Sequence, residues 1–252
     1  MKKWKAVVIA AVALAAIATA ARADWYPGEP YKMVKVQMPD PFGWDIEIFS
    51  PQHEVADDWQ CSQSGAVSDI HFWTSWPRDE VGVIQWLSVA IYSNVVAGSV
   101  PFSQPGTPLW GRTFQQGEFR VIDPYGQGDQ GFADPQQREW IGWGAHDHQM
   151  YQQINITDIV RPFPQKEGEI YWLGIYAGWE GITQPPVGWK TSLDHFMDVA
   201  VYKDLETGAW TPLIDRAGNG LDMAFVITPE PATLALMGLG VAGLVARRRN
   251  RS

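Results

Sequence analysis

Short segments in which apolar and polar residues alternate recur through the body of the chain, and turn-forming residues separate them. In residues 83–92 the alternation places Val83, Leu87, Val89 and Ile91 on one face, as in a half-buried β-strand. The 24 glycines and 18 prolines punctuate such segments, and no long amphipathic helix interrupts them. The sequence therefore predicts an all-β fold, a single β-sandwich or jelly-roll-like domain.

Residues 68–76 form a second segment of this kind. Ile70, Phe72 and Trp76 share its apolar face, whereas Asp69, His71 and Ser75 share the other. The remaining candidate strands, which are rich in β-branched and aromatic residues, are 44–49, 111–122, 169–178, 198–203 and 222–228.

The N-terminus has the features of a secretory signal peptide. Lysines at positions 2, 3 and 5 precede a continuous apolar stretch, and Ala21-Arg22-Ala23 fits a small-x-small cleavage site. We expect residues 1–23 to form a signal helix that directs the chain to the Sec translocon. Signal peptidase then cleaves it off, so that the mature chain begins at Asp24. The alternative is an uncleaved N-terminal anchor, for which the apolar stretch is short.

The C-terminus has three parts in residues 228–252. Pro229-Glu230-Pro231 is followed by a short apolar segment and then by a basic cluster that includes Arg247, Arg248 and Arg249. The apolar segment is shorter than the roughly 20 residues of a full span, which favours a short, transient transmembrane helix over an ordinary tail anchor. Because basic residues stay on the cytoplasmic side, everything between the two ends is expected outside the inner membrane.

This arrangement of a Pro-Glu-Pro motif, a short apolar helix and an arginine cluster resembles the PEP-CTERM sorting domain of Gram-negative bacteria. The resemblance implies that an exosortase cuts near Pro229-Glu230-Pro231. It further implies transient anchoring in the inner membrane and then delivery to the cell surface or the extracellular matrix. It says nothing of what the body of the protein does.

The body, residues 24–227, is expected to be one extracytoplasmic domain. The stretches 56–61, 67–76, 171–175 and 188–196 are similar to the blocks of an uncharacterised β-rich domain family of exported bacterial proteins. The similarity covers most of residues 45–227. It implies a common β-rich fold and no catalytic residue, because no activity is assigned to that family.

Charge and cysteine usage restrict the partners. Residues 24–228 hold 27 acidic and 11 basic side chains, a net charge of −16 with histidine neutral, and such a surface repels nucleic acid. Cys61 is the one cysteine, so the chain forms no internal disulfide. We expect its thiol to be a small buried side chain.

Tryptophan is abundant, and 13 of the 14 residues lie outside the signal peptide. Most are expected in the core. Trp140, Trp143, Trp179 and Trp189 stand near glycine-rich turns, and we predict that they offer flat rings on which sugars stack.

Two metal hypotheses remain open. His146 and His148 share one face of a strand, a spacing that suits zinc or copper if His71 or His195 supplies a third ligand; solvated loop histidines are the alternative. Residues 123–129 form an aspartate- and glycine-rich turn that suits a structural calcium, as do Asp57 and Asp58 elsewhere. Ordinary turn chemistry explains the same residues without a cofactor.

The chain contains no nucleophile elbow, zinc-protease motif or phosphate-binding loop. The favoured interpretation is a non-catalytic surface or matrix protein that binds exopolysaccharide. The alternative is an exported hydrolase or lyase whose Asp and His groups, centred on His71, His146, His148 and His195, converge in a cleft.

Overall fold

The computed structural model describes residues 24–49, 53–137, 139–141, 147–204 and 207–229. The predicted signal helix, the predicted C-terminal helix, Glu230, Pro231 and the arginines at 247–249 lie outside these residues, as do Trp143 and His146. Within the described ranges, no helix has both the length and the apolar character needed to cross a bilayer.

The described chain is built from β-strands, as the alternation in the sequence predicts. In chain order the strands are β1 (Trp44–Glu47), β2 (Val55–Gln60), β3 (Gly65–Val67), β4 (Asp69–Ser75), β5 (Trp86–Val95), β6 (Gln104–Gln115), β7 (Arg120–Asp134), β8 (Glu139–Ile141), β9 (His148–Ile156), β10 (Phe163–Gln165), β11 (Ile170–Gly178), β12 (Gly188–Ser192), β13 (Val201–Lys203), β14 (Trp210–Pro212), β15 (Asp222–Met223) and β16 (Phe225–Thr228). One 3-10 turn, η2 (Pro77–Asp79), follows β4.

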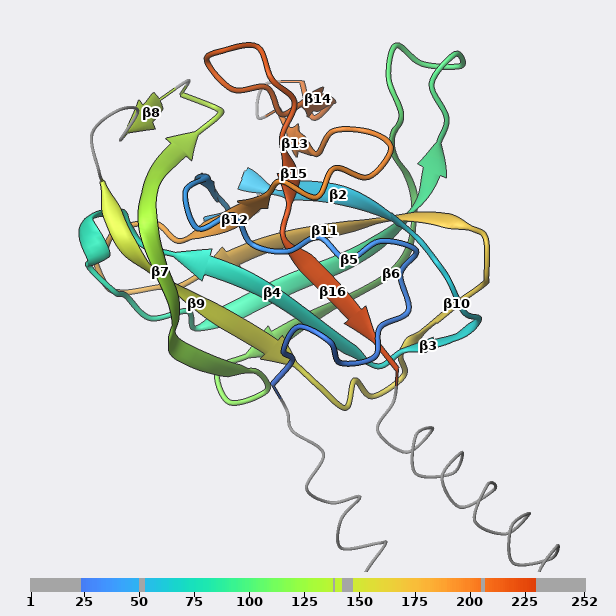
Figure 1. Cartoon of the computed structure of the whole chain (residues 1–252), viewed down its shortest axis with the longest axis horizontal. Helices are drawn as coiled ribbons and strands as arrows, with labels where there is room; N and C mark the ends of the chain where they lie inside the picture. The colour runs from blue at the N-terminus through green and yellow to red at the C-terminus, as the bar shows by residue number, and fades with distance from the viewer. Residues whose placement is uncertain (1–23, 50–52, 138, 142–146, 205–206, 230–252) are drawn as a thin grey trace, which may run out of the picture.

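Two large sheets make up the fold. One contains β15-β12-β1-β7-β9-β4-β16 in that order, with β8 paired to β7, and the other contains β14-β13-β2-β11-β5-β6. A small sheet pairs β10 with β3. In Figure 1 strands β4, β9 and β16 of the first sheet lie in front of β5 and β11 of the second.

The first sheet closes on itself, which the sequence did not indicate. Strand β12 pairs with β1 on one side and with β4 on the other, so β12, β1, β7, β9 and β4 form a five-stranded barrel. Gly188 pairs with both Glu47 and Ser75, and a Cβ there would lie 2.7 Å from the Phe132 ring. The all-β prediction is thus confirmed, whereas the simple two-layer sandwich is corrected to a closed barrel beside an open sheet.

The main core lies between the barrel and the open sheet. Leu87, Val89 and Ile91 of β5 point into it, as predicted, and meet Phe72 and Ile154 of the barrel strands in one apolar cluster. Each of these side chains is fully or almost fully removed from water, which makes this cluster the main source of hydrophobic stabilisation. Cys61 is buried in the same cluster, as expected.

The polar face of β4 is buried as well. Asp69, His71 and Ser75 are buried. Trp73, which shares their face of β4, packs edge to face against Trp25, so the N-terminal segment covers part of that face. His71 contacts the Asn155 amide oxygen through Nδ1, and its Nε2 lies 3.2 Å from Thr228 Oγ1. Alternation thus identified the strand but not how many of its faces are covered.

Both ends of the described chain lie on one side of the molecule (Figure 1). The Lys32 backbone amide donates to the Ile227 carbonyl, and Gln37 forms a β-bridge with Phe225. The residues before β1 therefore run beside the last strand, which ends one residue before Pro229.

We predict that His71 makes the fold sensitive to mild acid. Burial lowers the pKa of His71 to about 4. The folded state therefore keeps this histidine neutral while the unfolded chain takes up a proton below about pH 6.5, so stability is lost as pH falls from 6.5 towards 4. The loss attributable to this group is up to about 3 kcal/mol. Urea unfolding of the His71→Gln variant across this range should show a flatter pH dependence than the parent, and an unchanged slope would contradict the prediction.

Candidate functional site

The outer face of the open sheet carries a groove of about 430 Å³. Because side chains alternate along β5, Ser88, Ala90 and Tyr92 face away from the core that Leu87, Val89 and Ile91 fill. The volume falls in the range of small-molecule sites. The lining residues come from strands β5, β6, β11 and β13 and from the segment before β2: Glu54, Ser88, Val89, Ala90, Tyr92, Gly111, Arg112, Thr113, Tyr176 and Lys203.

Small residues form the floor of this groove. Ala90 and Gly111 are cross-strand partners on β5 and β6, and Gly174 of β11 pairs with Ala90 from the other side. A Cβ at Gly174 would lie 2.5 Å from Glu54 Oε1 and 2.9 Å from the Tyr92 ring, so no larger residue fits without displacing them. The hollow thus lies over Ala90 and Gly111, whereas Glu54 and Tyr92 fill the space above Gly174.

Aromatic pairs stand on this face of the sheet. Trp86 and Tyr176 meet edge to face with ring centroids 5.7 Å apart, and Tyr92 and Trp210 do so at 5.8 Å. Trp86, Tyr176 and Trp210 are only partly buried, so part of each ring remains available to a ligand. Rings of this kind are the flat apolar surfaces on which sugar faces stack.

Polar groups lie between the rings. The Tyr92 hydroxyl donates to Glu54 Oε1 at 2.6 Å, and Lys203 Nζ lies 3.5 Å from Glu54 Oε2. Burial and the neighbouring Glu54 carboxylate raise the pKa of Tyr92, so this hydroxyl keeps its proton at neutral pH. Convergent charged and hydroxyl groups beside aromatic rings can orient a polyhydroxylated ligand.

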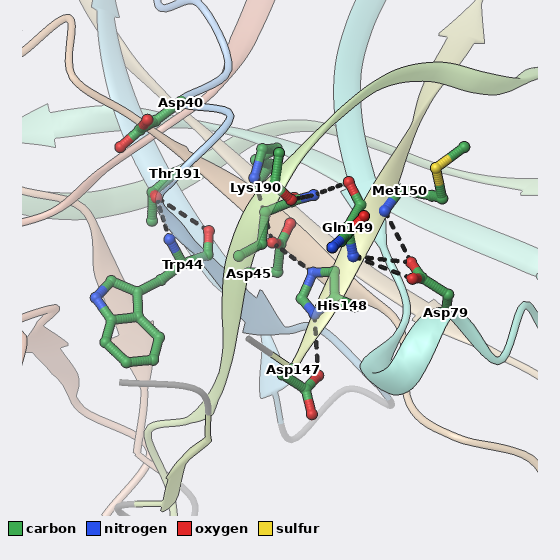
Figure 2. Close-up of polar contacts among 12 residues, drawn as sticks. Asp40, Trp44, Asp45, Asp79, Asp147, His148, Gln149, Met150, Lys190 and Thr191 are labelled. Atoms are coloured by element: carbon green, nitrogen blue, oxygen red, sulfur yellow. Dashed lines mark hydrogen bonds and ion pairs between the residues drawn. The ribbon is translucent and has the colours of Figure 1, made fainter. Parts of the chain in front are cut away.

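A second polar assembly fills the interior of the barrel (Figure 2). Lys190 of β12 is fully buried, with Nζ 3.3 Å from Asp45 Oδ2 on β1 and in contact with the Gln130 side chain on β7. Asp45 Oδ2 also lies 3.0 Å from His148 Nε2 on β9. Asp45 and Lys190 are cross-strand partners on adjacent strands, whereas the Lys190–Gln130 and Asp45–His148 contacts join strands that are not neighbours and so cross the barrel. Together these contacts pair charges that would be costly to bury alone.

The structure corrects the prediction that His148 is a metal ligand. Its Nε2 is bound to Asp45, and its Nδ1 lies 2.9 Å from Asp147 Oδ2, as Figure 2 shows. Both carboxylates lie within hydrogen-bond distance and can only accept, so both ring nitrogens of His148 act as donors and neither is left for a metal. Its predicted partner, His146, lies outside the described residues.

The predicted sugar-stacking tryptophans are located elsewhere than expected. Trp189 is fully buried and donates from Nε1 to the Ala224 carbonyl, and Trp179 is 8% exposed and stacks on Phe49, so both belong to the core. Trp140 is half-buried against Trp44 and lies outside the groove. A nearby glycine-rich turn therefore does not make an indole accessible. Its exposure depends on which face of the strand carries the side chain and on what packs against that face.

Three histidines of the predicted cluster are described, and they do not converge in one cleft. His71 binds Asn155 and Thr228, His148 binds two aspartates inside the barrel, and His195 is exposed with Nδ1 2.8 Å from Asp222 Oδ2. These three histidines therefore do not form the cluster that the hydrolase alternative predicts.

The aspartate-rich turn at 123–129 is part of strand β7 rather than a loop. Asp129 Oδ1 accepts from the Gln149 side chain, and Asp57 Oδ2 accepts from Gln37 and from the Met223 amide. In the described chain, these aspartates form no three-residue group with metal-ligand spacing. A structural calcium stays a prediction.

Sequence reasoning missed Tyr176, which lines the groove. It also missed Trp86 and Trp210, which pack on the lining residues Tyr176 and Tyr92. Trp86 is the first residue of β5 and falls out of phase with Leu87, Val89 and Ile91, which fill the core. That phase is the signal in the sequence that could have placed it on the outer face.

Comparison with known proteins gives two matches. The family model described as "Domain of unknown function (DUF7901)" matches residues 33–228, and the model described as "PEP-CTERM protein-sorting motif" matches residues 228–249. No curated protein and no solved structure matches the chain significantly. The two matched ranges meet at Thr228, the last residue of β16.

We predict that Asp45→Leu strongly destabilises the barrel. The substitution leaves Lys190 and His148 buried without their shared carboxylate, which costs about 3–5 kcal/mol. Chemical denaturation measures the loss. Combining it with Lys190→Met should recover part of the stability, and a double variant no more stable than the single one would refute the role of the pair. Arg78→Ala, which breaks an exposed ion pair with Glu80, is the control and should leave unfolding unchanged.

Proposed function

Since the chain belongs to the family of the domain of unknown function DUF7901 and ends in a PEP-CTERM protein-sorting motif, we propose that it is an exported exosortase substrate that binds polysaccharide at the cell surface. The protein acts as a non-catalytic surface or extracellular-matrix component. The observation that carries the binding function is the groove on the open sheet, where partly exposed aromatic pairs stand beside Glu54 and Lys203.

The position of the groove supports display at a surface. Strands β13 and β14, which supply Lys203 and Trp210, lie at the opposite end of the molecule from the two ends of the described chain (Figure 1). A domain held through the residues after Thr228 would direct this part of the groove away from its attachment point. Such an orientation leaves the aromatic rings accessible to an extended polymer.

Charge favours a neutral polysaccharide. Residues 24–228 carry a net charge of −16, which repels an anionic polymer at long range. Lys203 of the groove is already paired with Glu54, so it offers little uncompensated positive charge to a carboxylated sugar. Stacking on aromatic rings, by contrast, needs no charge on the ligand.

The route to the surface follows from the two ends of the sequence. The Sec translocon exports the chain, and signal peptidase removes residues 1–23. The C-terminal apolar segment then holds the protein in the inner membrane for a time. An exosortase then cuts near Pro229-Glu230-Pro231 and releases the domain to the cell surface or matrix.

We predict that Trp86→Ala and Trp210→Ala each weaken polysaccharide binding by about tenfold, because each removes a stacking surface. Affinity electrophoresis of the full chain through gels that contain neutral exopolysaccharide measures retardation. Trp140→Ala is the matched control: it truncates a half-buried tryptophan outside the groove and should keep the parental mobility shift. Loss of retardation in the Trp140 variant alone would move the binding site away from the open sheet.

Processing has its own test. We predict that replacing Pro229, Glu230 and Pro231 by alanine blocks cleavage, so that the chain accumulates uncut in the inner-membrane fraction of a cell that carries an exosortase. Immunoblots of membrane and surface fractions give the readout. Equal surface yields for the parent and the alanine variant would exclude a role for this motif in processing.

A further inference from the structure

Three potential metal ligands from separate parts of the chain meet at one end of the barrel. Glu47 is the last residue of β1, Asp134 is the last residue of β7, and His53 lies between β1 and β2. Strands β1 and β7 run parallel with Asp45 opposite Phe132, so the two acidic residues end at the same level. One ligand atom from each residue lies within 4.8 Å of the other two.

The orientation of His53 is fixed by the backbone. Its Nδ1 lies 2.6 Å from the Phe49 carbonyl oxygen, which can only accept, so Nδ1 carries the proton of that bond. The opposite ring nitrogen, Nε2, faces the acidic pair. A hydrogen bond on the far side of the ring is the usual device that aims a histidine at a metal.

His53 Nε2 has no hydrogen-bond partner although it is buried. It lies 3.6 Å from Glu47 Oε1 and 3.6 Å from Asp134 Oδ1, both beyond hydrogen-bond length. The three side chains are between 6% and 13% exposed, so water reaches them poorly. A cation placed between these atoms would satisfy a nitrogen lone pair and two carboxylates at once.

Neighbouring groups hold the carboxylates in place and add negative charge. Asp134 Oδ1 accepts from the backbone amides of Gln136 and Gln137 at 2.8 and 3.2 Å. The Glu139 carboxylate on β8 also acts on Glu47, so a third acidic side chain lies near the two proposed carboxylate ligands.

We propose that Glu47, His53 and Asp134 bind one divalent cation of the zinc class. An imidazole nitrogen with two carboxylate oxygens is a donor set that zinc accepts, whereas calcium prefers oxygen ligands throughout. Three protein ligands leave a fourth position for water. The metal would tie the ends of β1 and β7 to the segment that leads into β2.

The test is zinc binding to the purified full-length chain, prepared without a histidine tag and stripped with a chelator. Calorimetric titration with zinc chloride should give one site per chain, and zinc should raise the thermal unfolding temperature. X-ray absorption of the zinc-loaded protein should show nitrogen and oxygen ligands at about 2.0–2.2 Å. Absence of stoichiometric zinc binding by the parent would overturn the proposal.

His53→Gln and Asp134→Asn each remove one ligand and should weaken zinc binding by at least about tenfold. The glutamine can still donate to the Phe49 carbonyl, and near-ultraviolet circular dichroism checks that each variant folds. His195→Gln is the matched control, because it removes an exposed histidine that also contacts a carboxylate. Parental affinity in folded His53→Gln, or an equal loss in His195→Gln, would show that zinc binds elsewhere. If His53→Gln fails to fold, Glu47→Gln replaces it, with the same outcomes.

Discussion

The pairing of β12 with both β1 and β4 is the constraint on which the rest of the structure depends. It turns one sheet into a closed ring of five strands, and so small a ring has an interior just wide enough for side chains. Lys190 points into that interior from β12 and meets Asp45 there. Closure thus sets which residues face each other across the barrel, and it forces their charges to be paired.

Closure also shapes the two ends of the barrel. Asp45 and Glu47 lie on the same face of β1, two residues apart, so the interior network and the Glu47–His53–Asp134 cluster are successive layers of one assembly. Phe132 is the register partner of Asp45 on β7, and its ring centroid is 6.5 Å from that of His148. The proposed zinc would therefore close the barrel at the end where the paired charges stop.

The open sheet has the opposite character. One of its faces supplies Leu87, Val89 and Ile91 to the core, so only the other face is free to bind a ligand. Period-two alternation made this division predictable for β5. It did not predict the groove, because the hollow depends on Gly111 of β6, which strand pairing brings beside Ala90 of β5.

The sequence by itself determined that the chain is all-β and where the protein is sent. Alternation is a local property of a strand, and a sorting motif is read as a linear peptide, so neither needs the fold. Only the tertiary structure decided which side chains are exposed: Trp189 is buried and Trp86 partly open, although both stand in strands. It alone brought Glu47, His53 and Asp134 together, because contacts between residues distant in sequence depend on how the strands pair and close.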